Sequence, residues 1–188
     1  MQLNIPNILT LSRFFLIPFF VMFFYIPINN STFISTLIFI IAALTDLFDG
    51  FLARRWKQTT NFGSVLDPII DKIMVTIALI LVSEHFHICW ITIPTMIIIS
   101  REIIVSALRQ WIYSVNNLNR NNNLNCNIVS KISKIKTTLQ MLSLIALLWH
   151  PNIFIIKIGL ILIYMALIFT LWSMFLYIKI FQHILSIK

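Results

Sequence analysis

DLFDGFLARRWKQTTNFGSVLDPIID, residues 46–71, is the most unusual stretch of this chain. It holds four of the six acidic residues and two of the three glycines. Positions separated by three, four or seven residues share a face of an α-helix. The first half of the stretch therefore predicts one helix face made of Asp46, Asp49, Gly50 and Ala53. The second half predicts a single stripe on the next helix, made of Gly63, Asp67 and Asp71.

The connection between these two predicted helices is short, so we expect antiparallel neighbours whose acidic stripes face each other. A carboxylate inside a membrane costs about 2.5–3.5 kcal/mol on insertion scales. Hard divalent cations prefer carboxylate oxygens, so two shared ions would neutralise the cluster and leave positions for a substrate phosphate. The predicted metal ligands are Asp46, Asp49, Asp67 and Asp71. The alternative is that each Asp is an interfacial residue paired with a nearby base.

The composition around this stretch is that of a membrane protein. The chain has 188 residues, of which 59% are hydrophobic and 11% charged. Soluble domains average about 45–50% apolar and about 25% charged residues. A soluble protein would have too little polar surface, and a disordered chain would have few aromatic residues. We therefore expect the chemistry to be built into a helix bundle in the membrane.

The apolar runs predict six membrane-spanning helices, since each span needs roughly 20 apolar residues. The predicted spans lie near 8–28, 33–52, 65–83, 88–112, 136–150 and 153–178. These spans leave no room for a soluble domain. The predicted fold is thus an all-α, polytopic bundle, with residues 1–188 forming a single integral-membrane catalytic domain.

The basic residues predict the orientation of the bundle. Lys and Arg follow the second, fourth and sixth spans, whereas the connections 29–32, 84–87 and 151–152 contain neither. By the positive-inside rule, both termini and the loop at 54–62 face the cytoplasm. Arg13 lies close to that end of the first span, where its side chain is predicted to snorkel to the interface.

The motif D-x2-D-G-x2-A-R-x8-G-x3-D-x3-D, residues 46–71, resembles the signature of the CDP-alcohol phosphotransferase family at every defined position. Further similarity to the members that make phosphatidylglycerophosphate covers essentially the whole chain. It includes residues 4–7, Leu9-Thr10, Arg13, the segment 101–109 and residues 134–137. Ser133 departs from the glycine expected in the fifth span.

The resemblance implies transfer of a phosphatidyl group from CDP-diacylglycerol to sn-glycerol 3-phosphate, giving phosphatidylglycerophosphate and CMP. It implies two Mg²⁺ or Mn²⁺ ions, a homodimer and a place in the bacterial cytoplasmic (inner) membrane, among membrane lipids. It makes Asp71 the general base that takes the acceptor's hydroxyl proton. The implied CDP-diacylglycerol site consists of Asp46, Gly50, Ala53, Arg54 and Gly63. No nucleic-acid partner is expected.

The acceptor brings a phosphate of its own, which needs a cationic pocket. The candidates lie on the fourth helix and at the start of the fifth: Arg101, Arg109, Lys131, Lys134 and Lys136. Each lysine could instead serve topology and attract anionic lipids. Arg101 lies well inside an apolar run, where a charge marks function by default. Glu102 is predicted to pair with a base on a neighbouring helix.

Two other functions remain open from the sequence. The same chemistry could use another acceptor, as in cardiolipin, inositol-phosphate or serine transfer. A divalent-cation transporter would also explain an acidic cluster, but it would need acidic residues across the membrane, and only Glu84 lies near the other side. The motif Glu84-His85-Phe86-His87 resembles a small metal site but is predicted to be part of an outer interfacial loop.

Overall fold

The structure is a computed structural model in which the described residues form six α-helices and no strands. It describes the backbone of residues 5–27, 30–56, 61–118 and 126–186. Side chains are described for residues 12–27, 30–45, 69–108, 110, 135–179 and 181–182. The helices are α1 (Ile5–Tyr25), α2 (Ser31–Trp56), α3 (Asn61–Phe86), α4 (Cys89–Leu118), α5 (Cys126–Trp149) and α6 (Ile153–Ser186).

The predicted all-α class is confirmed, and each predicted span coincides with one helix. Most of the helices extend past the apolar runs that predicted them. For example, α2 continues to Trp56 and α5 begins at Cys126, well outside the predicted spans 33–52 and 136–150. The reason is that a helix satisfies its own backbone hydrogen bonds whether its side chains are apolar or polar. Hydropathy therefore locates a span but not the ends of its helix.

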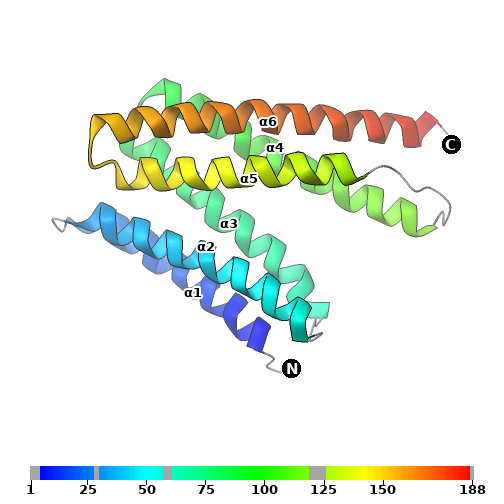
Figure 1. The fold of residues 1–188 in the computed structure, drawn as a ribbon, viewed down its shortest axis with the longest axis horizontal. Coiled ribbons are helices and arrows are strands. Elements are labelled where there is room, and N and C mark those ends of the chain that lie inside the picture. Colours follow the sequence, from blue (N-terminus) through cyan, green and yellow to red (C-terminus); the bar gives the residue numbers. More distant parts are fainter. Residues whose placement is uncertain (1–4, 28–29, 57–60, 119–125, 187–188) are drawn as a thin grey trace.

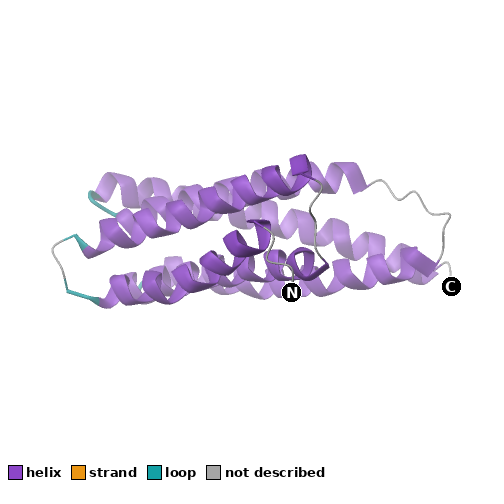
Figure 2. Cartoon of the chain, turned by 90° about the horizontal axis from the view of Figure 1, so that it is seen from below, coloured by secondary structure: helices purple, strands orange, loops and turns teal. Residues whose placement is uncertain are grey.

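In Figure 1, α5 and α6 run along the long axis of the molecule, and α1, α2 and α3 slant away from them. Figure 2 shows the same bundle from below. Helices α1 and α2 form one antiparallel pair, α5 and α6 form another, and α3 and α4 lie behind them (Figure 1). The two pairs converge near the start of α2 and diverge toward its end (Figure 1). The first residues of α1 and the last residues of α6 lie toward the same end of the bundle. This agrees with an even number of crossings.

The contact between α5 and α6 depends on a glycine. A Cβ atom placed on Gly159 would lie 2.8 Å from side-chain atoms of Leu147, too close for an ordinary contact. The hydroxyl of Ser143 donates a hydrogen bond of 2.9 Å to the Gly159 carbonyl, which joins the two helices at the same level. The missing side chain therefore lets the two backbones approach closely.

The molecule buries a core of aliphatic and aromatic side chains, among them Phe20, Phe39 and Leu144. It also leaves many large apolar side chains exposed, such as Trp90 at 72% and Phe154 at 72%. Soluble monomers rarely expose large contiguous apolar patches. An apolar outer surface of this extent fits contact with lipid.

Two stretches in the described residues are long and apolar enough to cross a membrane, Cys89–Leu108 and Ile153–Lys179. Only 22% of the most apolar part of the second stretch is buried within the molecule. The apolar stretches described for α1, α2 and α5 are shorter. These lengths suggest a membrane protein.

The end of α3 differs from the prediction. Glu84, His85 and Phe86 belong to the last turn of α3, so only His87 of that motif lies in the connection to α4. His87 has a φ of 48°, a left-handed conformation that often follows a helix end. The rings of His85 and His150 lie 4.5 Å apart, which brings the end of α3 against the turn between α5 and α6.

Candidate active site

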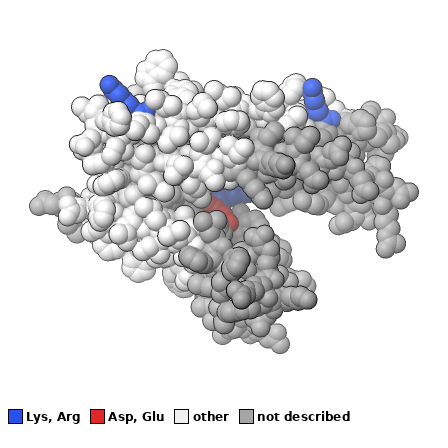
Figure 3. Space-filling model, viewed as in Figure 1, with Lys and Arg blue, Asp and Glu red and all other residues white. Residues whose placement is uncertain are grey.

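A pocket of about 590 Å³ opens between four helices and has both charged and apolar walls. Its charged side chains come from α3, α4 and α5: Asp71, Lys72, Arg101, Glu102 and Lys136. In the space-filling view, acidic and basic atoms meet in a central hollow whose described surroundings are mostly uncharged (Figure 3). A mostly apolar cavity with a few charged groups on one side is a candidate substrate site.

The apolar walls of the pocket come mainly from α2 and α5. The first contributes Ile40, Ala43 and Leu44, and the second contributes Met141, Leu142 and Ile145. Thr137, Thr138 and Ser106 add hydroxyl groups near the charged side. The pocket can therefore accommodate a molecule with an ionic head and a hydrocarbon portion.

Asp71 of α3 is bound by a cation from α1. An Nη atom of Arg13 donates to an Oδ atom of Asp71, and the two side chains form an ion pair. The Arg13 side chain is 3% exposed, so the prediction that it snorkels to the interface is wrong. A guanidinium inside an apolar bundle is stabilised by a carboxylate partner, and Asp71 supplies one. Asp71 itself remains 34% exposed at the pocket wall.

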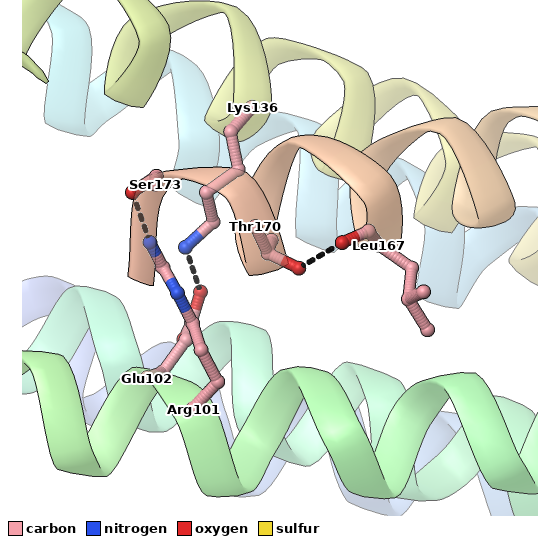
Figure 4. Close-up of polar contacts among 6 residues, drawn as sticks. All are labelled: Arg101, Glu102, Lys136, Leu167, Thr170 and Ser173. Carbon is pink, nitrogen blue, oxygen red and sulfur yellow. Dashed lines mark hydrogen bonds and ion pairs between the residues drawn. The ribbon is translucent and has the colours of Figure 1, made fainter. Parts of the chain in front are cut away.

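Arg101 of α4 reaches across to α6. Its Nη2 atom donates a hydrogen bond to the hydroxyl oxygen of Ser173, which is fully buried (Figure 4). Arg101 is only 5% exposed, yet it also lines the pocket. Its positive charge is thus held at the pocket wall and largely shielded from solvent.

Lys136 of α5 pairs with the residue next to Arg101. Its Nζ donates to Oε1 of Glu102 at 3.0 Å, and the two side chains are 5% and 13% exposed (Figure 4). This confirms that Glu102 pairs with a base on a neighbouring helix. Among the described side chains that line the pocket, three are basic (Lys72, Arg101 and Lys136) and two are acidic (Asp71 and Glu102). The basic side chains can attract an anionic ligand.

The pocket brings together three of the residues predicted for the site, Asp71, Arg101 and Lys136. The other predicted residues lie outside those whose side chains the structure describes. They are Asp46, Asp49, Gly50, Ala53, Arg54, Gly63, Asp67, Arg109, Lys131 and Lys134. The backbone at each of these positions is helical, on α2, α3, α4 or α5.

The described part of the site fits a hard divalent cation through Asp71, whose partly exposed carboxylate is the oxygen donor such ions prefer. A carboxylate has several acceptor positions, so an ion pair with Arg13 does not exhaust it. Within the described side chains, no three His, Cys, Asp or Glu residues form a metal cluster. The other three predicted ligands, Asp46, Asp49 and Asp67, lie beyond that part of the chain.

The sequence did not identify Ser173 or the partner of Arg13. An arginine in an apolar helix and an aspartate on another could have suggested the Arg13–Asp71 pair. Ser173 gave no such signal. Thr170 on the same helix is also a buried hydroxyl residue, but it bonds to a carbonyl of its own helix. The residue type alone therefore does not mark which hydroxyl contacts Arg101.

Comparison with known proteins gives a consistent result over nearly the whole chain. The profile of the CDP-alcohol phosphatidyltransferase family matches residues 3–172. A protein of Sodalis glossinidius is 52% identical over 183 residues, 97% of either chain. Proteins of Escherichia coli K12 and Shigella flexneri are each 52% identical over 179 residues, 95% of either chain. All three are named CDP-diacylglycerol–glycerol-3-phosphate 3-phosphatidyltransferase.

Proposed function

The chain belongs to the CDP-alcohol phosphatidyltransferase family, and from this we propose what happens in its interhelical pocket. The enzyme transfers the phosphatidyl group of CDP-diacylglycerol to sn-glycerol 3-phosphate. The products are phosphatidylglycerophosphate and CMP, which places the enzyme in phospholipid biosynthesis. The observation that carries the assignment of the site is the juxtaposition of Asp71, Arg101 and Lys136 in one pocket with apolar walls.

The shape of the pocket suits both substrates. The lipid donor has a hydrocarbon portion that the residues of α2 and α5 can contact, and an ionic part that belongs at the charged side. The acceptor is small and anionic, and the basic side chains of Arg101 and Lys136 in the pocket favour it. Both substrates can therefore meet at the boundary between the apolar and charged walls.

The acceptor's phosphate is held by Arg101 and Lys136 in this proposal. A guanidinium can make two parallel hydrogen bonds to phosphate, and an ammonium adds a second positive charge. The ammonium of Lys136 has three N–H donors, so it can donate to the phosphate as well as to Glu102. We assign three further basic residues to this site, from the second half of α4 and the start of α5: Arg109, Lys131 and Lys134.

Members of the family depend on divalent cations, and we assign two Mg²⁺ or Mn²⁺ ions to the acidic residues of α2 and α3. The proposed ligands are Asp46, Asp49, Asp67 and Asp71. When bound, such ions neutralise the diphosphate and stabilise the charge that develops as CMP departs. The cytidine diphosphate portion of the donor is assigned to Asp46, Gly50, Ala53, Arg54 and Gly63.

Asp71 acts as the general base. Its carboxylate takes the proton of the acceptor's primary hydroxyl, whose oxygen forms a bond to the phosphorus next to the diacylglycerol. The bond from this phosphorus to the bridging oxygen breaks, and CMP leaves with the electron pair. Arg13 holds the carboxylate of Asp71 from the side of α1, which limits the directions in which it can turn.

The arrangement in the membrane follows the same proposal. We assign the chain, as a single catalytic domain, to the bacterial inner membrane with six crossings and both termini in the cytoplasm. The charged side of the pocket would then face the leaflet from which nucleotide and glycerol phosphate arrive. A homodimer among membrane lipids completes the proposed assembly.

The decisive experiment offers purified protein CDP-diacylglycerol, Mg²⁺ or Mn²⁺, and one acceptor at a time. Glycerol 3-phosphate should give CMP and phosphatidylglycerophosphate, whereas serine, inositol phosphate and phosphatidylglycerol should give little product. Formation of another lipid in preference would assign the chain a different acceptor. Metal flux through vesicles without CMP release would instead favour a divalent-cation transporter.

A further inference from the structure

Ser173 lies outside the pocket but contacts a residue that lines it. The pocket is lined by residues of α2, α3, α4 and α5, and the hydroxyl of Ser173 on α6 accepts a hydrogen bond from Arg101 at the pocket wall. Ser173 is fully buried, so this contact is shielded from water. The direction in which Arg101 extends is therefore set in part by a helix that does not form the pocket wall.

We propose that Ser173 is a positioning residue, which holds the guanidinium of Arg101 in the orientation that receives the acceptor's phosphate. The inference rests on the proposed role of Arg101 in binding glycerol 3-phosphate. Ser173 touches neither substrate in this proposal. It acts on acceptor affinity through Arg101 alone.

The chemistry of arginine supports this role. Fixing a long side chain in one orientation costs roughly 1.5–2 kcal/mol of conformational entropy. A site that fixes the side chain before the ligand arrives spares the ligand that cost. The guanidinium has five N–H donors in a rigid plane, so one bond to a hydroxyl oxygen restricts the directions that the other donors can take. Ser173 supplies that bond from outside the pocket lining.

The neighbouring hydroxyl on α6 provides a contrast. Thr170 lies three residues earlier and is equally buried, but its Oγ1 donates at 2.6 Å to the carbonyl oxygen of Leu167 in its own helix (Figure 4). The two residues are thus matched in helix, depth and hydroxyl group. They differ in partner, because only Ser173 contacts a charged residue of the pocket.

The two basic residues of the proposed phosphate site, Arg101 and Lys136, have different partners. Lys136 pairs with Glu102, which belongs to the pocket lining itself. Loss of the Ser173 hydroxyl therefore disturbs the orientation of Arg101 and leaves the Lys136–Glu102 pair in place. The expected result is a weaker acceptor site that retains part of its positive charge.

The test compares Ser173→Ala with the control Thr170→Val in purified, metal-supplied enzyme. With CDP-diacylglycerol saturating, S173A should raise KM for glycerol 3-phosphate about tenfold, while kcat and KM for CDP-diacylglycerol change less than twofold. Tenfold corresponds to about 1.4 kcal/mol. T170V should change all three constants less than twofold. An unchanged acceptor KM in S173A would overturn the proposal, as would an equal rise of both KM values.

A second pair of variants covers the case in which S173A does not fold. Ser173→Thr and Ser173→Val have nearly the same shape and differ in the hydroxyl, so acceptor KM should be higher in S173V. Equal values for the two variants would overturn the proposal. The thermal unfolding temperature of each protein in detergent is measured beside its kinetics.

Arg101→Lys separates this inference from the proposed function. If Arg101 binds the acceptor, R101K alone should raise acceptor KM, and adding S173A should cause little further rise, because the two residues act as one unit. An R101K enzyme with a normal acceptor KM would refute the proposed phosphate site. A raised KM in R101K, with a full additional rise from S173A, would refute the role of Ser173 alone.

Discussion

Arg13 of α1 and Asp71 of α3 form an ion pair although 58 positions separate them in the chain. Arg13 is almost completely buried, whereas Asp71 is partly exposed at the pocket wall. The first helix therefore contributes to the site through the residue proposed as the general base. The two helices are coupled through their charges as well as through their apolar contacts.

Arg13→Gln should lower turnover about 10–100-fold, the usual effect of removing a group that orients a ligand or a base from behind. The reason is that Asp71 loses the cation that fixes its carboxylate. CMP release at saturating substrates is the measurement. Wild-type turnover in R13Q would show that Asp71 needs no orientation from α1.

Asp71→Asn should retain CDP-diacylglycerol binding while losing roughly 10²–10⁴-fold in turnover, the range expected for a general base. An amide preserves the shape of the side chain but cannot take the hydroxyl proton. The control is Glu84→Gln, the same chemical change near the other end of α3, where Glu84 accepts a hydrogen bond from Tyr25. Equal turnover in D71N and E84Q would remove Asp71 from this role.

Glu102→Ala should lower the free energy of unfolding by about 3–5 kcal/mol, because it leaves the charge of Lys136 buried without its carboxylate. Unfolding in mixed micelles by heat or denaturant measures the loss. Replacing both partners, with Glu102→Leu and Lys136→Met, should recover much of the stability but not the activity. A single variant as stable as the wild type would contradict the assigned burial of this pair.

Gly159→Ala should destabilise the protein by about 1–3 kcal/mol through overpacking, since the new Cβ would meet Leu147 at 2.8 Å. The double variant Gly159→Ala with Leu147→Ala provides the space and should be more stable than expected from the two single changes. Thermal unfolding of the four proteins gives this coupling. Strict additivity would mean that α5 and α6 adjust at this contact without strain.

The stability of the protein should fall as the pH drops through the titration range of His85. Partial burial and the neighbouring rings of His150 and His87 lower the pKa of His85 below its ordinary value of 6.5. A lowered pKa means that the folded state favours the neutral ring. The contribution is therefore complete above about pH 6.5 and is lost as the pH falls through the folded pKa.

Unfolding temperature measured across pH 5–8 tests this dependence, with the roughly 6.5 reference value as its upper limit. His85→Asn should flatten the profile over this range. Parallel profiles for the wild type and H85N would rule out His85 as the source.

Much of this organisation could be predicted from the sequence because hydrophobic runs locate helices and isolated charges locate function. Arg101 was identified as a functional candidate by its place within an apolar run, and the structure puts it at the pocket. The sequence also predicts that Glu102 pairs with a basic residue, because burying an unpaired carboxylate is costly. In both cases one residue and its local surroundings carried the information.

The remaining features depend on how helices are rotated against each other, which a single sequence does not encode locally. The position of Arg13 near the end of an apolar run predicts a side chain at the interface. The sequence does not show that Asp71 lies close enough to pair with it inside the bundle. Hydroxyls such as Ser35, Thr36 and Ser100 bond to carbonyls of their own helix, as is usual. Nothing local distinguishes Ser173 from them.

Because Arg13 pairs with Asp71, the amino-terminal helix contributes a residue to the site in addition to any role as a membrane anchor. A generic apolar segment fused in its place would still insert into a bilayer, yet it would bring no guanidinium to the carboxylate behind it. Chimeras, tags and shortened versions of this enzyme should therefore preserve the first helix intact, in sequence and in register.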